Sequence, residues 1–295
     1  MTIENSFSPG QAIAPVFRWL NINFHAAFEA FSDAINAALV LVETPLISGP
    51  PIIVITILSV AACLLTSWRT AVLVAVGFTT CFLAGLWKET METTALVAVA
   101  VLVALAIGIP LGILASRQRR IELGLRPILD VMQTLPPWVY LVPAVILFGL
   151  GRVPAVIATV IYGTPPILRI TTLAIKGVPR DRIELGRAFG ASDRMILWKI
   201  ELPSALPTIL VGINQCIILS LAMVVLAGLV GAGGLGAEVT RGLTRMEMGL
   251  GLRAGLAVVI LALILDRFSR ATLTARRTRP LTGIANALRG RRKNK

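Results

Sequence analysis

Residues 184–203, ELGRAFGASDRMILWKIELP, are densely charged, whereas most of the remaining sequence is apolar. This contrast indicates which parts of the chain lie inside a membrane and which lie outside. Of 295 residues, 56% are hydrophobic and only 15% are charged, and the mean hydropathy is +0.83. Several runs of about 18 or more residues lack any charge, which is long enough for a helix to cross roughly 30 Å of hydrocarbon. The sequence therefore predicts an all-α polytopic membrane protein, with residues 184–203 in a loop outside the membrane.

The charge-free apolar runs predict about seven transmembrane helices. These cover residues 51–68, 70–87, 94–116, 131–150, 153–174, 204–230 and 248–266. Lysine and arginine collect after the third, the fifth and the last of these spans, on one side of the membrane, which the positive-inside rule makes cytoplasmic. The N-terminus then lies outside, in agreement with the four acidic residues and one basic residue among the first fifty.

The chain divides into three parts by composition. Residues 1–50 form an extracytoplasmic amphipathic segment, residues 51–268 a transmembrane domain with its charged loop at 179–203, and residues 269–295 a basic cytoplasmic tail. In the first part an apolar stripe at three- and four-residue spacing predicts a helix, which lies on the outer membrane surface or packs against the bundle. The stripe consists of Phe17, Leu20, Phe24, Phe28, Phe31, Ile35 and Leu39.

The net charge of +13 requires no nucleic acid partner, because the positive-inside distribution accounts for it. RNA and anionic lipid remain alternative ligands of the basic tail. Three scattered cysteines in apolar runs, Cys63, Cys81 and Cys216, predict neither a disulfide framework nor a metal site. The single histidine, His25, has no cluster of metal ligands near it in the sequence.

The charged loop has the sequence signals of two short helices that meet at Gly190. Pro179 suits the start of the first helix, and Gly190 suits the left-handed position after its end. Ser192 can cap the second helix, whose positive N-terminus Asp193 favours. We interpret a loop with such defined local structure as a docking surface and not as a flexible tether.

The spacing of Glu184, Gly190 and Ile200-Glu201-Leu202-Pro203 resembles the EAA loop of ABC importer permeases. That family has E-A-A, three residues, G, nine residues and I-x-L-P, and every interval matches here, although Leu185-Gly186 replaces the two alanines. The resemblance implies a coupling helix that sits in a groove of a cytoplasmic ATPase. The residues it assigns to this contact are Glu184, Gly190, Ala191, Ile200, Leu202 and Pro203.

Four further stretches look like the glycine betaine, proline betaine and choline branch of type I ABC importer permeases. These are residues 130–151, 162–179, 223–236 and 248–267. The resemblance covers about residues 94–267 and implies the permease subunit of an ATP-driven importer for a small quaternary amine, in the bacterial cytoplasmic membrane. It implies alternating access by a homodimer of the permease in membrane lipid. The partners it implies are a cytoplasmic ABC ATPase subunit and a soluble extracytoplasmic substrate-binding protein.

The chain contains no G-x-x-x-x-G-K-[ST] sequence, and so we expect no ATP site, no cofactor and no enzymatic activity in it. ATP and magnesium are expected on the partner ATPase. GAGGLG at 231–236 satisfies a dinucleotide-binding pattern but follows a membrane-length apolar run and lacks the later ribose-binding acid. The resemblance instead places Gly231, Gly233, Gly234 and Gly236 in an outer re-entrant turn near the permeation gate.

Uncharged polar residues in two spans predict a substrate pathway. A span interrupted by proline frees backbone carbonyl groups at membrane depth, where transporters often bind their ligands. The alternative is that these side chains tie helices together by hydrogen bonds. The candidates are Gln133, Thr134 and Tyr140 around Pro136-Pro137 and Pro143, with Asn214, Gln215 and Ser220 in the sixth span.

Three other functions remain open at the level of sequence. The same architecture could import histidine or proline. An ATP-independent secondary transporter or channel would usually bury carboxylates along its path, and the interiors of the predicted spans contain no Asp or Glu. A membrane scaffold would not require the intervals of the charged loop.

Overall fold

The computed structural model describes residues 9–277, and every regular element within that range is a helix. Their bounds are α1 Pro9–Ile47, α2 Pro51–Leu65, α3 Trp68–Leu83, α4 Trp87–Arg117, α5 Arg119–Thr134, α6 Trp138–Phe148, α7 Arg152–Lys176, α8 Arg180–Ala188, α9 Asp193–Ile196, η1 Leu197–Glu201, α10 Leu202–Ala227, η2 Gly228–Val230, α11 Gly234–Thr244 and α12 Met248–Arg277.

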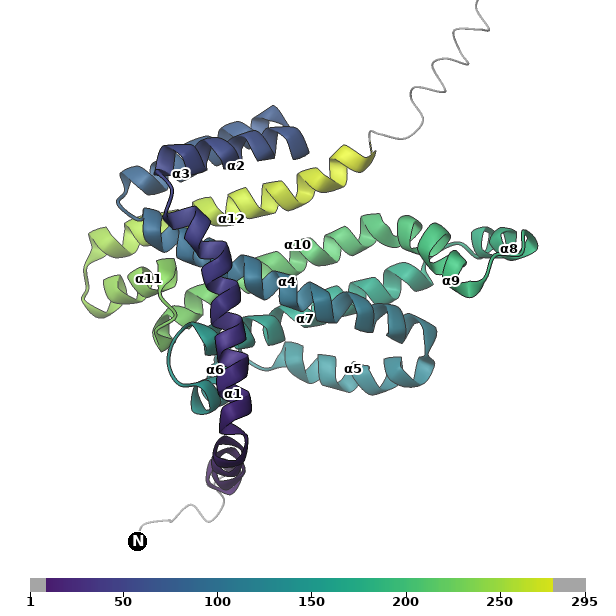
Figure 1. The fold of residues 1–295 in the computed structure, drawn as a ribbon, viewed down its shortest axis with the longest axis horizontal. Helices are drawn as coiled ribbons and strands as arrows, with labels where there is room; N and C mark the ends of the chain where they lie inside the picture. Colours follow the sequence, from purple (N-terminus) through teal and green to yellow (C-terminus); the bar gives the residue numbers. More distant parts are fainter. Residues whose placement is uncertain (1–8, 278–295) are drawn as a thin grey trace, which may run out of the picture.

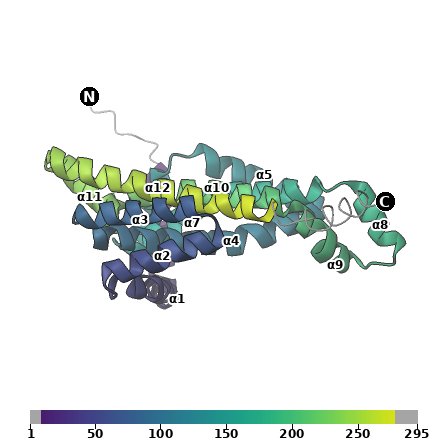
Figure 2. The same cartoon turned by 90° about the horizontal axis from the view of Figure 1, so that it is seen from above.

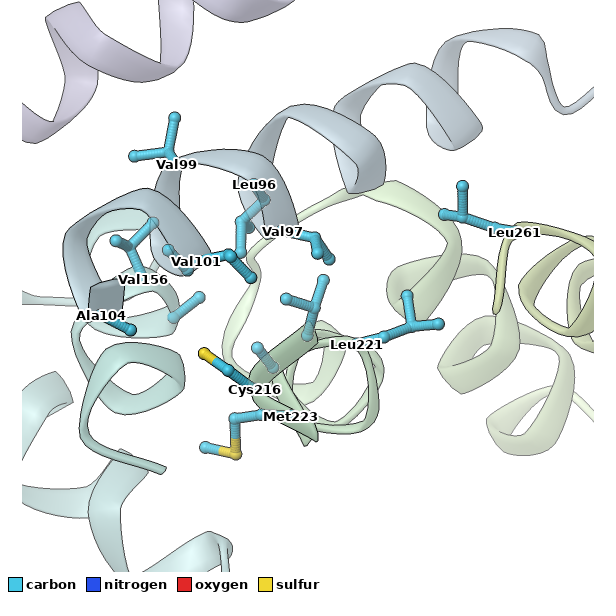
Figure 3. Close-up of a cluster of buried hydrophobic side chains, with 14 of the residues drawn as sticks. Leu96, Val97, Val99, Val101, Ala104, Val156, Cys216, Leu221, Met223 and Leu261 are labelled. Carbon is cyan, nitrogen blue, oxygen red and sulfur yellow. The ribbon is translucent and has the colours of Figure 1, made fainter. Parts of the chain in front are cut away.

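The helices α4, α7 and α10 form the centre of the bundle, and their side chains make up the densest part of the core (Figure 3). Glycines allow these helices to approach closely. A Cβ atom on Gly112 of α4 would lie 2.9 Å from the Leu168 carbonyl oxygen of α7, and one on Gly212 of α10 would lie 3.0 Å from Ile167 of α7. Small residues at such contacts favour helix association within a membrane.

The two ends of the bundle carry different structures. The short helices α8 and α9 lie at one end of its long axis, and α11 lies at the other (Figures 1 and 2). Because α8 and α9 carry arginines and are flanked by Lys176 and Lys199, their end faces the cytoplasm by the positive-inside rule. The gate turn and α11 then lie at the outer end.

The prediction of seven transmembrane spans needs correction in its first two members. Residues 51–68 and 70–87 fold as α2 and α3, which have 15 and 16 residues. At about 1.5 Å per residue each is too short to cross roughly 30 Å of hydrocarbon. Among the described residues, five helices are long and apolar enough to span a membrane, or six if one bent pair counts as a span. Because α2 and α3 form a hairpin, the chain returns to the side where α2 began, as it would after two full spans. The start of α4 therefore stays on the predicted outer side.

The predicted span at 131–150 is also not one straight helix. It divides into the end of α5 and the whole of α6, whose axes meet at 99°. Pro136 and Pro137 lie at the break, where they cannot donate backbone hydrogen bonds to a continuing helix. The Tyr140 hydroxyl group donates to the Met132 carbonyl oxygen at 2.6 Å and so holds the two arms of the bend together.

The N-terminal helix α1 is long and apolar enough to span a membrane, but its direction is that of a helix lying in the membrane plane. It crosses the long axis of the bundle in Figure 1 and is seen end-on in Figure 2. Ile35 and Leu39 of its predicted stripe are buried, and the Phe28 ring lies 5.2 Å from the Phe148 ring of α6. Of the two predicted alternatives, packing against the bundle is therefore confirmed for the part of α1 from Phe28 to Leu39.

The boundary predicted at residue 268 falls inside α12, which continues to Arg277. The rest of the predicted basic tail, residues 278–295, and residues 1–8 lie outside the described residues.

Candidate coupling surface and outer gate

The charged loop folds as its sequence predicts. Pro179 precedes the first turn of α8, and the Ser192 hydroxyl oxygen accepts the Met195 N–H at 3.4 Å at the start of α9. Asp193 lies in the first turn of α9, next to the positive end of that helix. A π-helical turn, η1, then joins α9 to α10. The loop is therefore a pair of ordered helices at the cytoplasmic end of α10.

Gly190 adopts the left-handed conformation expected of it, with φ of +73°. Its N–H donates to the Arg187 carbonyl oxygen at 2.9 Å, and the Ala191 N–H donates to the Gly186 carbonyl oxygen at 3.0 Å. These two bonds satisfy carbonyl groups that the end of α8 would otherwise leave unpaired. Gly190 and Ala191 thus form the turn that sets α8 against η1.

The side of α8 that faces away from the bundle carries exposed apolar side chains. Leu185 is 60% exposed and Phe189 is 84% exposed, an unusual state for large apolar side chains outside the membrane. Glu184 beside them is exposed and forms no ion pair within the part of the chain that the structure describes. Ile200 and Pro203 line a groove between α8 and the start of α10, together with Arg182, Leu185, Gly186, Phe189, Lys199 and Ser204. Leu202 is half-buried at the start of α10.

The structure adds a residue that sequence reasoning had passed over. Glu201, the variable position in Ile200-Glu201-Leu202-Pro203, is 4% exposed and pairs with Arg117 at the cytoplasmic end of α4. A buried carboxylate needs such a partner because desolvation penalises an isolated charge. A charged residue between the apolar positions of this pattern is the only signal that the sequence offered.

The predicted gate turn joins α10 to α11 at the outer end of the bundle. Gly231, Gly233 and Gly234 have φ of +80°, +80° and +65°, which residues with a Cβ atom rarely adopt. Gly236 needs its small size for another reason, since a Cβ there would lie 2.6 Å from the Val225 carbonyl oxygen. The glycines therefore allow both the turn and the close packing of α11 on α10.

Two side chains of α4 hold the start of α11. The Glu92 carboxylate accepts the Gly234 N–H at 2.9 Å, and the Thr93 hydroxyl oxygen accepts the Leu235 N–H at 2.8 Å. A carboxylate at a helix N-terminus satisfies a free N–H and complements the positive end of the helix dipole. Neither residue was a sequence candidate, because positions 92 and 234 become neighbours only in the folded bundle.

Arg152, the first residue of α7, extends this cluster. Its guanidinium lies 3.1 Å from Glu92 and also pairs with Glu43 of α1. The Gly151 N–H beside it donates to the Val230 carbonyl oxygen at 2.9 Å. The outer gate turn is thus linked to α1, α4 and α7 through one arginine and two carboxylates.

The six predicted pathway residues are not brought to one surface. Tyr140 and Ser220 are buried, Tyr140 bonded across the α5–α6 bend and Ser220 in the contact between α7 and α10. Asn214 donates to Asp266 at 3.3 Å and accepts from Ser269, which ties α10 to α12. Gln133, Thr134 and Gln215 are exposed in the single subunit. The predicted alternative, hydrogen bonds that tie helical segments together, describes Tyr140 and Asn214. The buried Ser220 hydroxyl group has no hydrogen-bond partner among the described residues. Pathway lining stays a prediction for the exposed three.

The arrangement defines a class of protein: a helical membrane domain with a pair of ordered, charged helices at its cytoplasmic end and a glycine-rich turn at the other. Residues 108–277 match the family described as binding-protein-dependent transport system inner membrane component, and this chain belongs to that family. The predicted fold class and membrane location are thereby confirmed.

Individual relatives agree with this assignment. The chain is 42% identical over 253 residues, 86% of its own length and 72% of the other's, to the glycine betaine/proline betaine transport system permease protein ProW of Escherichia coli (strain K12). It is 39% identical to the glycine betaine transport system permease protein OpuAB of Bacillus subtilis (strain 168), over 88% and 93% of the two chains. An inward-facing structure of the MetNI methionine ABC transporter matches 63% of this chain and 95% of its own, with a TM-score of 0.53 and 26% identity.

Proposed function

We propose that this permease carries a small quaternary amine, glycine betaine, proline betaine or choline, across the membrane by alternating access. The relative ProW is a glycine betaine/proline betaine permease protein, and OpuAB is a glycine betaine permease protein. These substrates carry a fully alkylated nitrogen, which cannot donate a hydrogen bond and is commonly held by aromatic rings. Tyr140 and Tyr162, whose ring centroids lie 6.5 Å apart, form one of several aromatic pairs among the described residues. Because the Tyr140 hydroxyl group already bonds across the α5–α6 bend, we assign high-affinity recognition of the cation to the substrate-binding protein.

The observation that carries the ATP-driven part of the proposal is the surface of α8. Exposed Leu185 and Phe189 lie beside the exposed acidic residues Asp181 and Glu184, at the cytoplasmic end of the bundle. Such a face needs a protein partner, since a soluble surface rarely exposes large apolar groups together. We assign this partner as an ABC ATPase subunit, which binds ATP and magnesium and hydrolyses ATP, whereas this chain does not.

Two further partners complete the proposed transporter. A second copy of the permease would close the pathway, which the exposed polar side chains of Gln133, Thr134 and Gln215 would then line. An extracytoplasmic substrate-binding protein would deliver substrate at the outer end, next to α11. Membrane lipid would cover the exposed apolar side chains of α2 and α3, among them Ile52, Leu64 and Val76.

A carrier without an ATPase is less well supported by the charges. The two buried carboxylates among the described residues, Glu201 and Glu238, each pair with an arginine. A proton- or ion-coupled carrier needs a carboxylate that can exchange its partner along the path. These two are engaged in ion pairs with Arg117 and Arg241 instead.

Uptake of labelled glycine betaine and choline tests the proposal, in cells that hold this chain, its ATPase and its binding protein. Unlabelled histidine and proline serve as competitors. Glu184→Lys should abolish uptake, whereas Glu29→Lys, a charge reversal at an exposed acid of α1 that pairs with His25 in its own helix, should leave it within about twofold. Uptake that survives Glu184→Lys would contradict ATPase docking, and competition by histidine or proline would contradict the quaternary amine.

A further inference from the structure

The helix α4 contacts both of the regions described above. Its outer end carries Glu92 and Thr93, which hold the start of α11, and its cytoplasmic end carries Arg117, which holds Glu201 of the coupling segment. The 31 residues of α4 make it one continuous helix of about 46 Å. A single helix therefore connects the ATPase-docking loop to the outer gate turn through specific polar contacts at both ends.

The outer contact is built for a defined position of α11. Thr93 is 1% exposed and its hydroxyl group donates to the Glu89 carbonyl oxygen at 2.8 Å, which orients its oxygen toward the Leu235 N–H. Glu92 uses one carboxylate oxygen for Gly234 and the other for Arg152. A Cβ atom on Gly234 would lie 2.5 Å from the Thr93 hydroxyl oxygen, so the contact also depends on glycine. Movement of α11 away from α4 would leave a carboxylate and two N–H groups without these partners.

The cytoplasmic contact is equally specific. The Glu201 side chain is 5% exposed, and Arg117 is its ion-pair partner from outside the coupling segment. Glu201 ends the π-helical turn η1, into which α9 passes directly. Displacement of α8 and α9 by a partner ATPase would therefore either move Arg117 and α4 with it or break a buried ion pair, and breaking a buried pair is costly.

We propose that α4 transmits the movement of the coupling loop to the outer gate turn, with Glu92 and Thr93 as positioning residues for α11 and with Arg117–Glu201 as the attachment at the other end. The inference rests on the proposed docking of an ATPase on α8. In this proposal the contacts of Glu92 and Thr93 with α11 are made in one state of the gate and lost in the other. A free energy of coupling between two sites requires such a difference in contacts between the two states.

The test uses the assembled transporter, permease with ATPase and binding protein, in lipid vesicles, with glycine betaine as substrate. The measured quantity is the amount of substrate moved per ATP hydrolysed. Thr93→Val keeps the shape of the side chain and removes the acceptor for Leu235, while Glu92→Gln keeps its size and removes its charge. Thr94→Val is the matched control, because within the described residues the Thr94 hydroxyl group bonds to its own helix, at the Thr90 carbonyl oxygen, 2.7 Å away.

Thr93→Val and Glu92→Gln should each lower the transport ratio by about fivefold or more while ATP hydrolysis continues, and Thr94→Val should stay within about twofold. Arg117→Gln should likewise lower the ratio without releasing the ATPase. A ratio unchanged in Thr93→Val, or ATP hydrolysis and uptake that fall in equal proportion, would overturn the proposal. Glu184→Lys, measured in parallel for ATPase binding, shows separately whether the docking assignment itself fails.

Discussion

Gly186 of α8 lies directly against Ile200 of η1. A Cβ atom on Gly186 would lie 2.5 Å from the Ile200 Cδ1 atom. The departure from the family pattern, glycine where an alanine is usual, therefore falls at the point where the coupling helix packs on the segment that leads into α10. The apolar residue of the I-x-L-P pattern fills the space that the missing methyl group leaves.

Gly186→Ala should be tolerated. The close atom is the far end of a flexible side chain, so Ile200 can shift, and alanine favours the helix by roughly 1 kcal/mol. Gly186→Leu cannot be accommodated in the same way and should detach α8 from η1. Co-purification of the ATPase with each variant measures this, with retention expected for alanine and loss for leucine. Loss with alanine would mean that the Ile200 contact is rigid.

Polar substitution of the exposed apolar face of α8 should weaken ATPase binding without unfolding the permease. Leu185→Ser and Phe189→Ser together remove most of that face, and buried apolar side chains contribute about 1.5–3 kcal/mol each. The affinity of the detergent-solubilised permease for its ATPase should fall at least about tenfold. Leu243→Ser, at an equally exposed leucine of α11, is the control and should not change the affinity. Equal loss in the control would point to a general folding defect.

Gly190→Ala should destabilise the coupling loop by roughly 1–2 kcal/mol, the cost of a left-handed backbone for a residue with a Cβ atom. No atom lies within 4 Å of the added carbon, so the effect is one of backbone conformation alone. Gly124→Ala is matched to it, because that helical glycine also faces open space but has an ordinary φ. Protease cleavage of the loop should become faster in Gly190→Ala and stay unchanged in Gly124→Ala. The opposite order would refute the conformational argument.

The pathway candidates should separate into two groups. Ser220→Ala should leave uptake and selectivity within about twofold, because the side chain is buried against Gly163 in the contact between α7 and α10. Asn214→Ala should lower thermal stability by about 1–3 kcal/mol, since Asp266 and Ser269 lose a partner.

Gln133→Ala and Gln215→Ala, which change exposed side chains, should alter substrate affinity and not stability. Uptake kinetics with several quaternary amines, measured beside thermal unfolding, distinguish the groups. Normal kinetics in both glutamine variants would remove these residues from the pathway.

Local signals predicted the coupling loop well. Pro179, Gly190 and Ser192 act through their own backbone conformation or through bonds to residues three or four positions away, and so a linear reading could place them. The number of spans was predicted less well. Hydropathy measures the length of an apolar run but not where a helix stops. It separated α2 from α3 but extended both past their ends at Leu65 and Leu83, and it did not register the 99° bend at Pro136-Pro137.

Composition, charge distribution and the intervals of the charged loop are local properties, and so the sequence alone predicted a helical membrane permease, which the family match confirms. The role of that loop in docking an ATPase stays a prediction. Only the tertiary structure decided which residues join the two ends of the bundle. Glu43, Glu92, Arg152 and Gly234 are separated by dozens of residues, as are Arg117 and Glu201, and they meet only where helices pack. The partner of a charged side chain depends on how several helices pack together, and the spacing of residues along the chain does not contain this information.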